Sequence, residues 1–138
     1  MKRGGIMSTS KSIEMLKNKS TPERYIRTVS TIGVDGQLTL LRSKVAVIGA
    51  GRLGGTVVEL LAKIGVGYIR VIDGECFKAN NCDRHFLNNY KNIGRNKAEA
   101  VVEHIACINS DIAVQAVPVM LDKENAGEVL NGVDVIVD

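Results

Sequence analysis

Residues 44–55 read KVAVIGAGRLGG, and this stretch decides the fold. Residues 45–48 form an uninterrupted apolar run, which is typical of a parallel strand covered on both faces. The glycines that follow have the spacing of a nucleotide-binding turn, G-x-G-x-x-G, at Gly49, Gly51 and Gly54. The first permits a tight turn, the second lets backbone amides approach a phosphate, and the third lets the next helix pack closely on the strand. The stretch therefore predicts a phosphate-binding loop between a buried strand and a helix.

An acidic residue supports this interpretation. The next apolar run, residues 68–72, ends at Asp73, which follows the last glycine by about 20 residues, the usual place for a carboxylate that binds ribose hydroxyls. The helix after the glycines would add unpaired amides and about half a positive charge to the phosphate site. The alternative is that the glycines only allow close packing, and the order strand, glycine turn, helix, strand, acid favours the nucleotide site.

The composition is typical of a cytoplasmic, single-domain protein. The chain has 138 residues, of which 45% are apolar, enough to bury one core. No apolar run approaches the ~20 residues of a membrane span, and no apolar segment follows the basic start as it would in a secretory signal. Three widely spaced cysteines do not describe a disulfide framework and fit a reducing compartment.

The positive charge is confined to the start of the chain. The net charge is +3, but residues 1–20 carry five basic side chains and one acidic one. A general nucleic-acid-binding surface is therefore not indicated. Residues 1–19 are predicted to be a polar leader, with at most a short helix around residues 13–16 and otherwise a frayed terminus. Residues 20–138 are predicted to form an ATP-binding domain that is truncated at its C-terminal end.

A helical segment is predicted between the leader and the first strand. The hydroxyl of Thr21 would cap a helix with Pro22 in its first turn, and this helix would end near Gly33. A turn at residues 35–36 and a short helix at residues 37–42 would then lead into the strand.

Helices and strands alternate after the glycine turn. A helix is predicted to end at Gly65, followed by strands at residues 68–72, 112–119 and 133–137 and helices at residues 96–109 and 123–130. The alternation predicts an α/β fold, a Rossmann-like doubly wound parallel sheet with an N-terminal helical segment. In the strand order 3-2-1-4 the fourth strand would lie at an edge of the sheet.

The connection at residues 74–95 is too long for a plain turn, since ~2–6 residues are usual between a strand and a helix. This connection and the next helix start contain side chains that bind anions: Asn80, Asn81, Arg84, Arg95 and Lys97. All of them follow the carboxyl end of a strand, the edge at which ligands bind in open α/β sheets. The alternative, a solvated charged stretch, explains neither this position nor the asparagines.

Four stretches, RYIRTVSTIGVDGQ, KVAVIGAGRLGG, GVGYIRVIDGECFKANNCDRH and NIGRNKAEA, resemble the ThiF/MoeB-type adenylyltransferases, the bacterial relatives of ubiquitin-activating enzymes. The resemblance implies that this chain is the nucleotide-binding part of an enzyme that uses ATP and Mg²⁺. Such an enzyme adenylates the C-terminal carboxylate of a ubiquitin-like, sulfur-carrier type protein. It also implies a homodimer in the cytoplasm with no membrane partner and, unless the chain is a tRNA-modifying relative, no nucleic-acid partner.

The resemblance also implies roles for individual residues. The expected ATP-binding residues are Gly49, Gly51, Arg52, Gly54, Asp73, Glu75 and Asn81. The expected catalytic residues are Arg84 and Lys97, which would neutralise phosphate oxygens, and Arg27, which would reach into the partner subunit's site as an arginine finger. No residue is expected to be a metal ligand.

Some positions depart from the family's pattern. The family usually has glycine where Arg52 stands, and this side chain would either crowd ATP or pair with a phosphate. Leu and Gln are usual in place of Cys82 and His85, and the second acid of an Asp-x-Asp pair is here Glu75. The aspartate that binds magnesium would fall three residues beyond Asp138, and the carrier-binding half would lie later still. A chain of these 138 residues alone is therefore expected to be inactive.

Other interpretations of the sequence remain open. An NAD(P)-linked oxidoreductase domain shares the glycine turn and Asp73 but gives no reason for the anion-binding side chains. A non-catalytic pseudo-adenylyltransferase or assembly subunit would tolerate Arg52. Zinc binding by a Cys82–His85 pair and a His104–Cys107 pair is not favoured, because the second pair lies on a predicted helix whose inner face is already apolar.

Overall fold

The computed structural model describes residues 4–81, 85 and 87–138, and their centre is a parallel sheet. Its strands are β1 (Lys44–Ile48), β2 (Tyr68–Ile72), β3 (Ala113–Val117) and β4 (Val135–Val137). They pair in the order β3-β2-β1-β4, the order considered above, and β4 lies at one edge of the sheet. The third and fourth strands are shorter than predicted.

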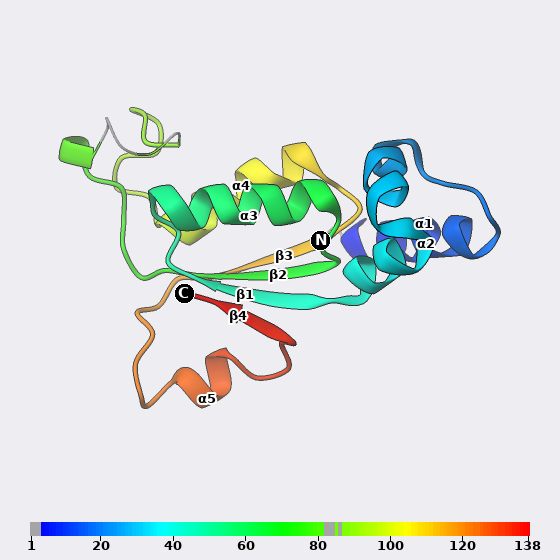
Figure 1. The fold of residues 1–138 in the computed structure, drawn as a ribbon. Coiled ribbons are helices and arrows are strands. Elements are labelled where there is room, and N and C mark those ends of the chain that lie inside the picture. Colours follow the sequence, from blue (N-terminus) through cyan, green and yellow to red (C-terminus); the bar gives the residue numbers. More distant parts are fainter. Residues whose placement is uncertain (1–3, 82–84, 86) are drawn as a thin grey trace.

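Helices cover both faces of the sheet (Figure 1). The helices α3 (Arg52–Ile64) and α4 (Lys97–Ile108) lie on one face, and the short helix α5 (Ala126–Val129) lies on the other. This arrangement confirms the α/β doubly wound fold. The main core lies under α3 and α4, where Val47 and Val71 of the sheet meet Val58 and Val101 of the helices, all at most 1% exposed. Among the described residues, no helix is long and apolar enough to cross a membrane.

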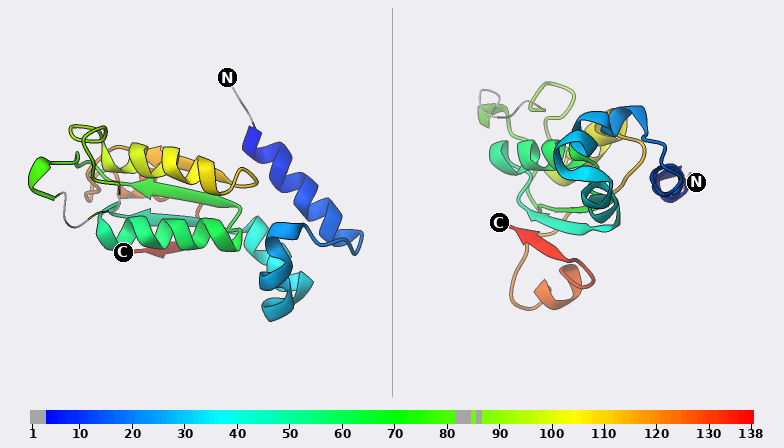
Figure 2. Two further views of the ribbon diagram at one scale, coloured as in Figure 1. Left: turned by 90° about the horizontal axis from the view of Figure 1, so that it is seen from above. Right: turned by 45° about the vertical axis from the view of Figure 1, so that its right-hand side comes forward.

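The start of the chain is a helix rather than the predicted frayed terminus. Helix α1 (Gly4–Lys17) packs beside α2 (Ile26–Arg42), beyond the end of the sheet at which β1 and β2 begin (Figure 2). Leu16 is 2% exposed and clusters with Tyr25 and Leu41. Most side chains of this segment are polar, so helix α1 is stabilised by packing against residues distant in the sequence, which a local pattern does not reveal.

The segment before β1 differs from the prediction in two details. A 3₁₀ turn, η1 (Glu23–Tyr25), precedes α2, and neither Thr21 nor Pro22 provides a side-chain cap. Gly33 interrupts α2 at φ 76°, as predicted, but the helix resumes immediately, so residues 35–36 are helical and not a turn. The left-handed backbone of one glycine is sufficient for the change of direction.

The C-terminal end of α3 is as predicted. Gly65 ends the helix in the left-handed region, at φ 87°. A Cβ at this position would lie 2.6 Å from Cε1 of Tyr25 and 2.7 Å from Nε2 of Gln37. The close approach at Gly65 thus joins the N-terminal helices to the sheet domain.

Candidate functional site

The loop between β1 and α3 has the geometry of a glycine-rich turn. Gly49 has a φ of 86°, and its amide donates to the carbonyl of Ile72 at 2.7 Å. A Cβ on Gly54 would lie 1.9 Å from the carbonyl oxygen of Gly49, so only glycine lets α3 start this close to the turn. A Cβ on Gly51 would have nothing within 4 Å, so the loop is open at this point.

The first turn of α3 supplies donors for an anion. The first hydrogen bond of the helix runs from the amide of Gly55 to the carbonyl of Gly51, at 2.8 Å. The amides of residues 52–54 precede this bond and have no acceptor within the helix. Together with the helix dipole they form an anion-binding terminus. Arg52 is exposed at the first helical position.

The carboxylate of Asp73 joins this loop to the next one. One of its oxygens accepts a hydrogen bond from the amide of Ala50 at 2.7 Å, and the other accepts from the amide of Glu75 at 2.8 Å. Each carboxylate oxygen has a second lone pair, so the half-buried side chain can still accept a hydroxyl proton. Asp73 therefore holds the glycine loop and remains available to a ribose.

Asn96 fixes the start of α4 beside Asp73. Its Oδ1 accepts from the amide of Glu99 at 3.1 Å, and its Nδ2 donates to the carbonyl of Asp73 at 2.7 Å. The sequence predicts the helix start, and asparagine followed three residues later by glutamate is a helix-capping pattern. The contact with Asp73 was not predicted, because 23 residues separate the two partners.

Lys97 is held at the same edge of the sheet. Its Nζ lies 2.5 Å from Oε2 of Glu75, and its amide donates to the carbonyl of Glu75 at 2.9 Å. The Lys97 side chain is only 11% exposed, whereas the Glu75 side chain is 59% exposed. The hydrogen bond and the charge of the Lys97 ammonium lower the pKa of the Glu75 carboxyl below its ordinary value of 4.5. The structure thus brings together Asp73, Glu75, Lys97 and the glycine loop.

The contact between Glu75 and Lys97 is expected to stabilise the fold less at acid pH. A lowered carboxyl pKa means that the contact adds to the free energy of unfolding above pH 4.5, and that this addition is lost as the pH falls below 4.5. Because Glu75 is largely exposed, Glu75→Gln should lower the free energy of unfolding by about 1 kcal/mol at neutral pH, and by less at an acid pH below 4.5. Chemical denaturation of both proteins, with Glu124→Gln as an exposed control, measures this; an equal loss at both pH values would contradict it.

His85 lies against the glycine loop. Its Nε2 is 2.8 Å from the carbonyl oxygen of Ala50, and its Nδ1 accepts from the amide of Leu87 at 3.0 Å. The imidazole is 8% exposed and contacts the ring of Phe77 edge-on, with the centroids 4.9 Å apart. From the sequence, His85 was noted as a departure from the usual Gln and as half of a zinc-binding pair. Its contact with Ala50 was not predicted, because 35 residues separate the two partners.

Residues 23–138 match the ThiF family. The chain belongs to this family. Among curated proteins, this ThiF-family chain is 36% identical over 118 residues to the SAMP-activating enzyme E1 of Haloferax volcanii, covering 84% of the chain and 44% of that protein. It is 34% identical over 122 residues to the sulfur carrier protein adenylyltransferase of Thermus thermophilus, covering 87% of the chain and 45% of that protein.

A solved structure agrees with the family assignment. The E. coli tRNA N6-threonylcarbamoyladenosine dehydratase, crystallised in complex with ATP, matches this ThiF-family chain with a TM-score of 0.78 and 26% sequence identity. The match covers 83% of this chain and 47% of the dehydratase. The ThiF-family chain thus spans less than half the length of these three relatives.

The remaining predicted site residues of this ThiF-family chain lie elsewhere or are not placed. Arg27 is exposed on α2, a helix that lies at the end of the sheet opposite the glycine loop (Figure 1), so it does not reach the loop of its own chain. Asn81 belongs to a 3₁₀ turn, η2 (Ala79–Asn81), and its side chain is outside what the structure describes. Arg84 and Cys82 lie outside the described residues.

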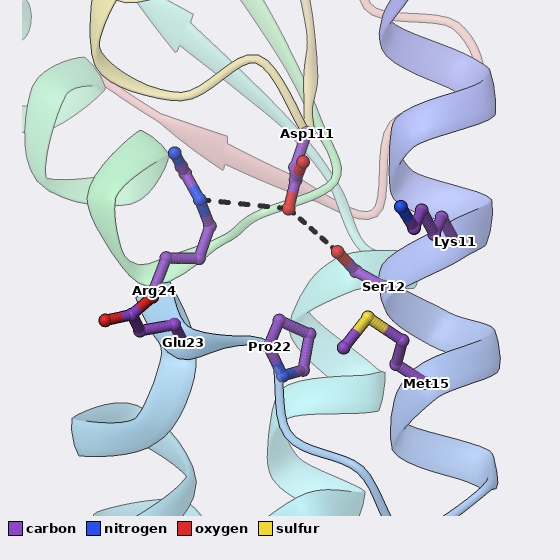
Figure 3. Close-up of a pocket in the computed structure, with 7 residues that line it drawn as sticks. All are labelled: Lys11, Ser12, Met15, Pro22, Glu23, Arg24 and Asp111. Carbon is purple, nitrogen blue, oxygen red and sulfur yellow. Dashed lines mark hydrogen bonds and ion pairs between the residues drawn. The ribbon is translucent and has the colours of Figure 1, made fainter.

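A cavity of about 550 Å³ is lined by α1, η1 and the segment just before β3 (Figure 3). Helix α1 lies at the end of the sheet opposite the glycine loop (Figure 1). Asp111 is one of the lining residues, and its Oδ2 accepts from the Ser12 hydroxyl at 2.7 Å and lies 3.8 Å from Nε of Arg24 (Figure 3). These contacts join helix α1 to the sheet domain. The cavity is separate from the candidate nucleotide site.

Proposed function

We propose that this chain binds ATP and is the nucleotide-binding part of an enzyme that adenylates the C-terminal carboxylate of a ubiquitin-like, sulfur-carrier type protein. The observation that supports this most is a continuous set of hydrogen bonds at one edge of the sheet. Ala50, Asp73, Glu75 and Lys97 are linked in that order by contacts of 2.5–2.9 Å. They join the glycine loop, the proposed ribose acceptor Asp73 and a buried cation in one framework.

The ATP would lie along this framework. The amides of the glycine loop and of the α3 terminus would bind the phosphates, and Asp73 would accept a ribose hydroxyl. The open space at Gly51 and the left-handed turn at Gly49 fit such a ligand. Asn81 and Arg84 are proposed as further contacts to the triphosphate.

The chemistry requires positive charge near the reacting phosphate. A carboxylate oxygen of the carrier attacks the α-phosphorus, the bond from that phosphorus to the bridging oxygen breaks, and pyrophosphate leaves with the electron pair. Both reactants are anions, so the protein contributes mainly position and charge. Lys97 is proposed to exchange its contact with Glu75 for a phosphate oxygen. Mg²⁺ bound with ATP would neutralise further phosphate charge, and no described residue is proposed as its ligand.

An exchange assay tests this function. The protein at its natural length is incubated with ATP, Mg²⁺, radiolabelled pyrophosphate and a panel of ubiquitin-like sulfur-carrier proteins. Label should enter ATP only with a carrier that ends in glycine, and removal of that glycine or of Mg²⁺ should abolish the exchange. Nucleotide binding without exchange for any carrier would contradict the catalytic part of the proposal.

The protein is also proposed to act as a homodimer in the cytoplasm. Arg27 lies far from its own glycine loop, and only a second copy of the chain would give it access to a nucleotide. The free thiols of Cys76 and Cys107 are exposed, which suits a reducing compartment.

Arg27→Ala is expected to slow the exchange reaction by about 10²–10³-fold, the usual effect of removing one donor of transition-state charge stabilisation. The dimer should persist in this variant by light scattering. Arg24→Ala is the matched control and should keep the wild-type exchange rate. Arg24 is on the neighbouring turn, and its guanidinium lies near Asp111 of its own chain. A strictly monomeric wild type, or a dimeric variant with undiminished exchange, would remove the role of Arg27 in the partner's site.

A further inference from the structure

We propose that His85 is a positioning residue for the triphosphate, acting through the backbone of the glycine loop. The proposal rests on the proposed ATP-binding function and adds a residue that does not itself touch the nucleotide. His85 comes from the long connection after β2, whereas its partner Ala50 lies in the loop after β1.

The hydrogen bonds of the imidazole determine its tautomer. Nδ1 accepts from the amide of Leu87 at 3.0 Å, so this nitrogen carries no proton. A neutral imidazole has one donor and one acceptor nitrogen, and Nε2 must therefore donate to the carbonyl of Ala50, 2.8 Å away. The edge-on contact with Phe77, which is 2% exposed, holds the ring in this orientation.

Both backbone groups of Ala50 are hydrogen-bonded. Its amide donates to Asp73 at 2.7 Å and its carbonyl accepts from His85, while the residue itself is 0% exposed. In a trans peptide the carbonyl and the next amide point in opposite directions. A carbonyl fixed towards His85 therefore directs the amide of Gly51 away from it, at the point where the loop is open. His85 thus orients the amide of Gly51, one of the proposed phosphate-binding donors.

Loss of the His85 imidazole would leave the buried carbonyl of Ala50 without its hydrogen-bond donor, and the Ala50–Gly51 peptide would be free to rotate. His85→Leu is expected to weaken ATP binding by about 10-fold or more, and to leave the affinity for adenosine, which has no phosphate, unchanged. His85→Gln should restore most of the ATP affinity, because its amide can donate to Ala50 and accept from Leu87. His104→Leu, the same change at a histidine between α3 and α4, should bind ATP as the wild type does.

Calorimetric titration of wild type and the three variants with ATP and with adenosine tests this role. Equal loss of ATP and adenosine binding in His85→Leu, or undiminished ATP binding, would overturn the role of His85 while leaving the proposed function intact. A wild type that binds no ATP would overturn both. If His85→Leu does not fold, ¹⁵N NMR of the wild-type imidazole decides: a proton on Nε2 is expected, and a proton on Nδ1 instead would overturn the proposal.

Discussion

Replacing Asp73 with alanine is expected to lower the affinity for ATP by about 100-fold or more, since hydrogen bonds to a charged group are worth about 1.5–3 kcal/mol each. The variant loses the proposed ribose acceptor and also the group that holds two backbone amides, those of Ala50 and Glu75. The glycine loop and the loop after β2 would then no longer be joined through a side chain.

Asp134→Ala is the matched control for this prediction. Asp134 also accepts a hydrogen bond from a backbone amide, that of Lys44 at 2.8 Å, but at the opposite end of β1. Calorimetric titration should show near-normal ATP affinity for Asp134→Ala, with circular dichroism confirming that both variants fold. ATP binding by Asp73→Ala at the wild-type level would show that Asp73 has only a structural role.

Two glycines of the same loop are both expected to lose ATP affinity on substitution by alanine, but only one of the two variants should be unstable. Gly54→Ala places a methyl group 1.9 Å from the carbonyl oxygen of Gly49, and a backbone atom cannot move aside without moving the turn. We expect this variant to lose at least about 3 kcal/mol of unfolding free energy and to bind no ATP. Thermal and chemical denaturation measure the first effect.

Gly51→Ala separates binding from folding. Its backbone, at φ −72° and ψ −162°, is accessible to any residue, and the added methyl group meets no protein atom within 4 Å. Stability should therefore change by no more than about 0.5 kcal/mol. ATP affinity should nevertheless fall by about 10-fold or more, because the methyl group would occupy space next to the amides that approach the phosphates. Wild-type ATP affinity in this variant would show that the phosphates lie elsewhere.

The parallel sheet was predictable because it depends on local signals. Residues 45–48 are apolar without interruption, Gly65 ends a helix at its predicted place, and helices alternate with strands along the chain. The strand order was assumed from the doubly wound fold, because no local signal sets it. The ends of the third and fourth strands were predicted too long, because apolar residues such as Ile112 and Val133 continue the pattern beyond the paired backbone.

The features that the sequence analysis missed depend on contacts between distant segments. Helix α1 is ordered by the cluster of Leu16 with Tyr25 and Leu41. The contacts of Asn96 with Asp73 and of His85 with Ala50 cross 23 and 35 residues of chain. No periodicity or spacing rule reports such pairs, because the pairing is set by the packing of the whole sheet edge.

The most direct test of the central claim is competition between ATP and NAD for the protein, measured by calorimetric titration. A glycine loop joined through Asp73 to a buried lysine predicts that ATP binds more tightly and that NAD is displaced by it. Tighter binding of NAD, or binding of neither nucleotide, would contradict the account.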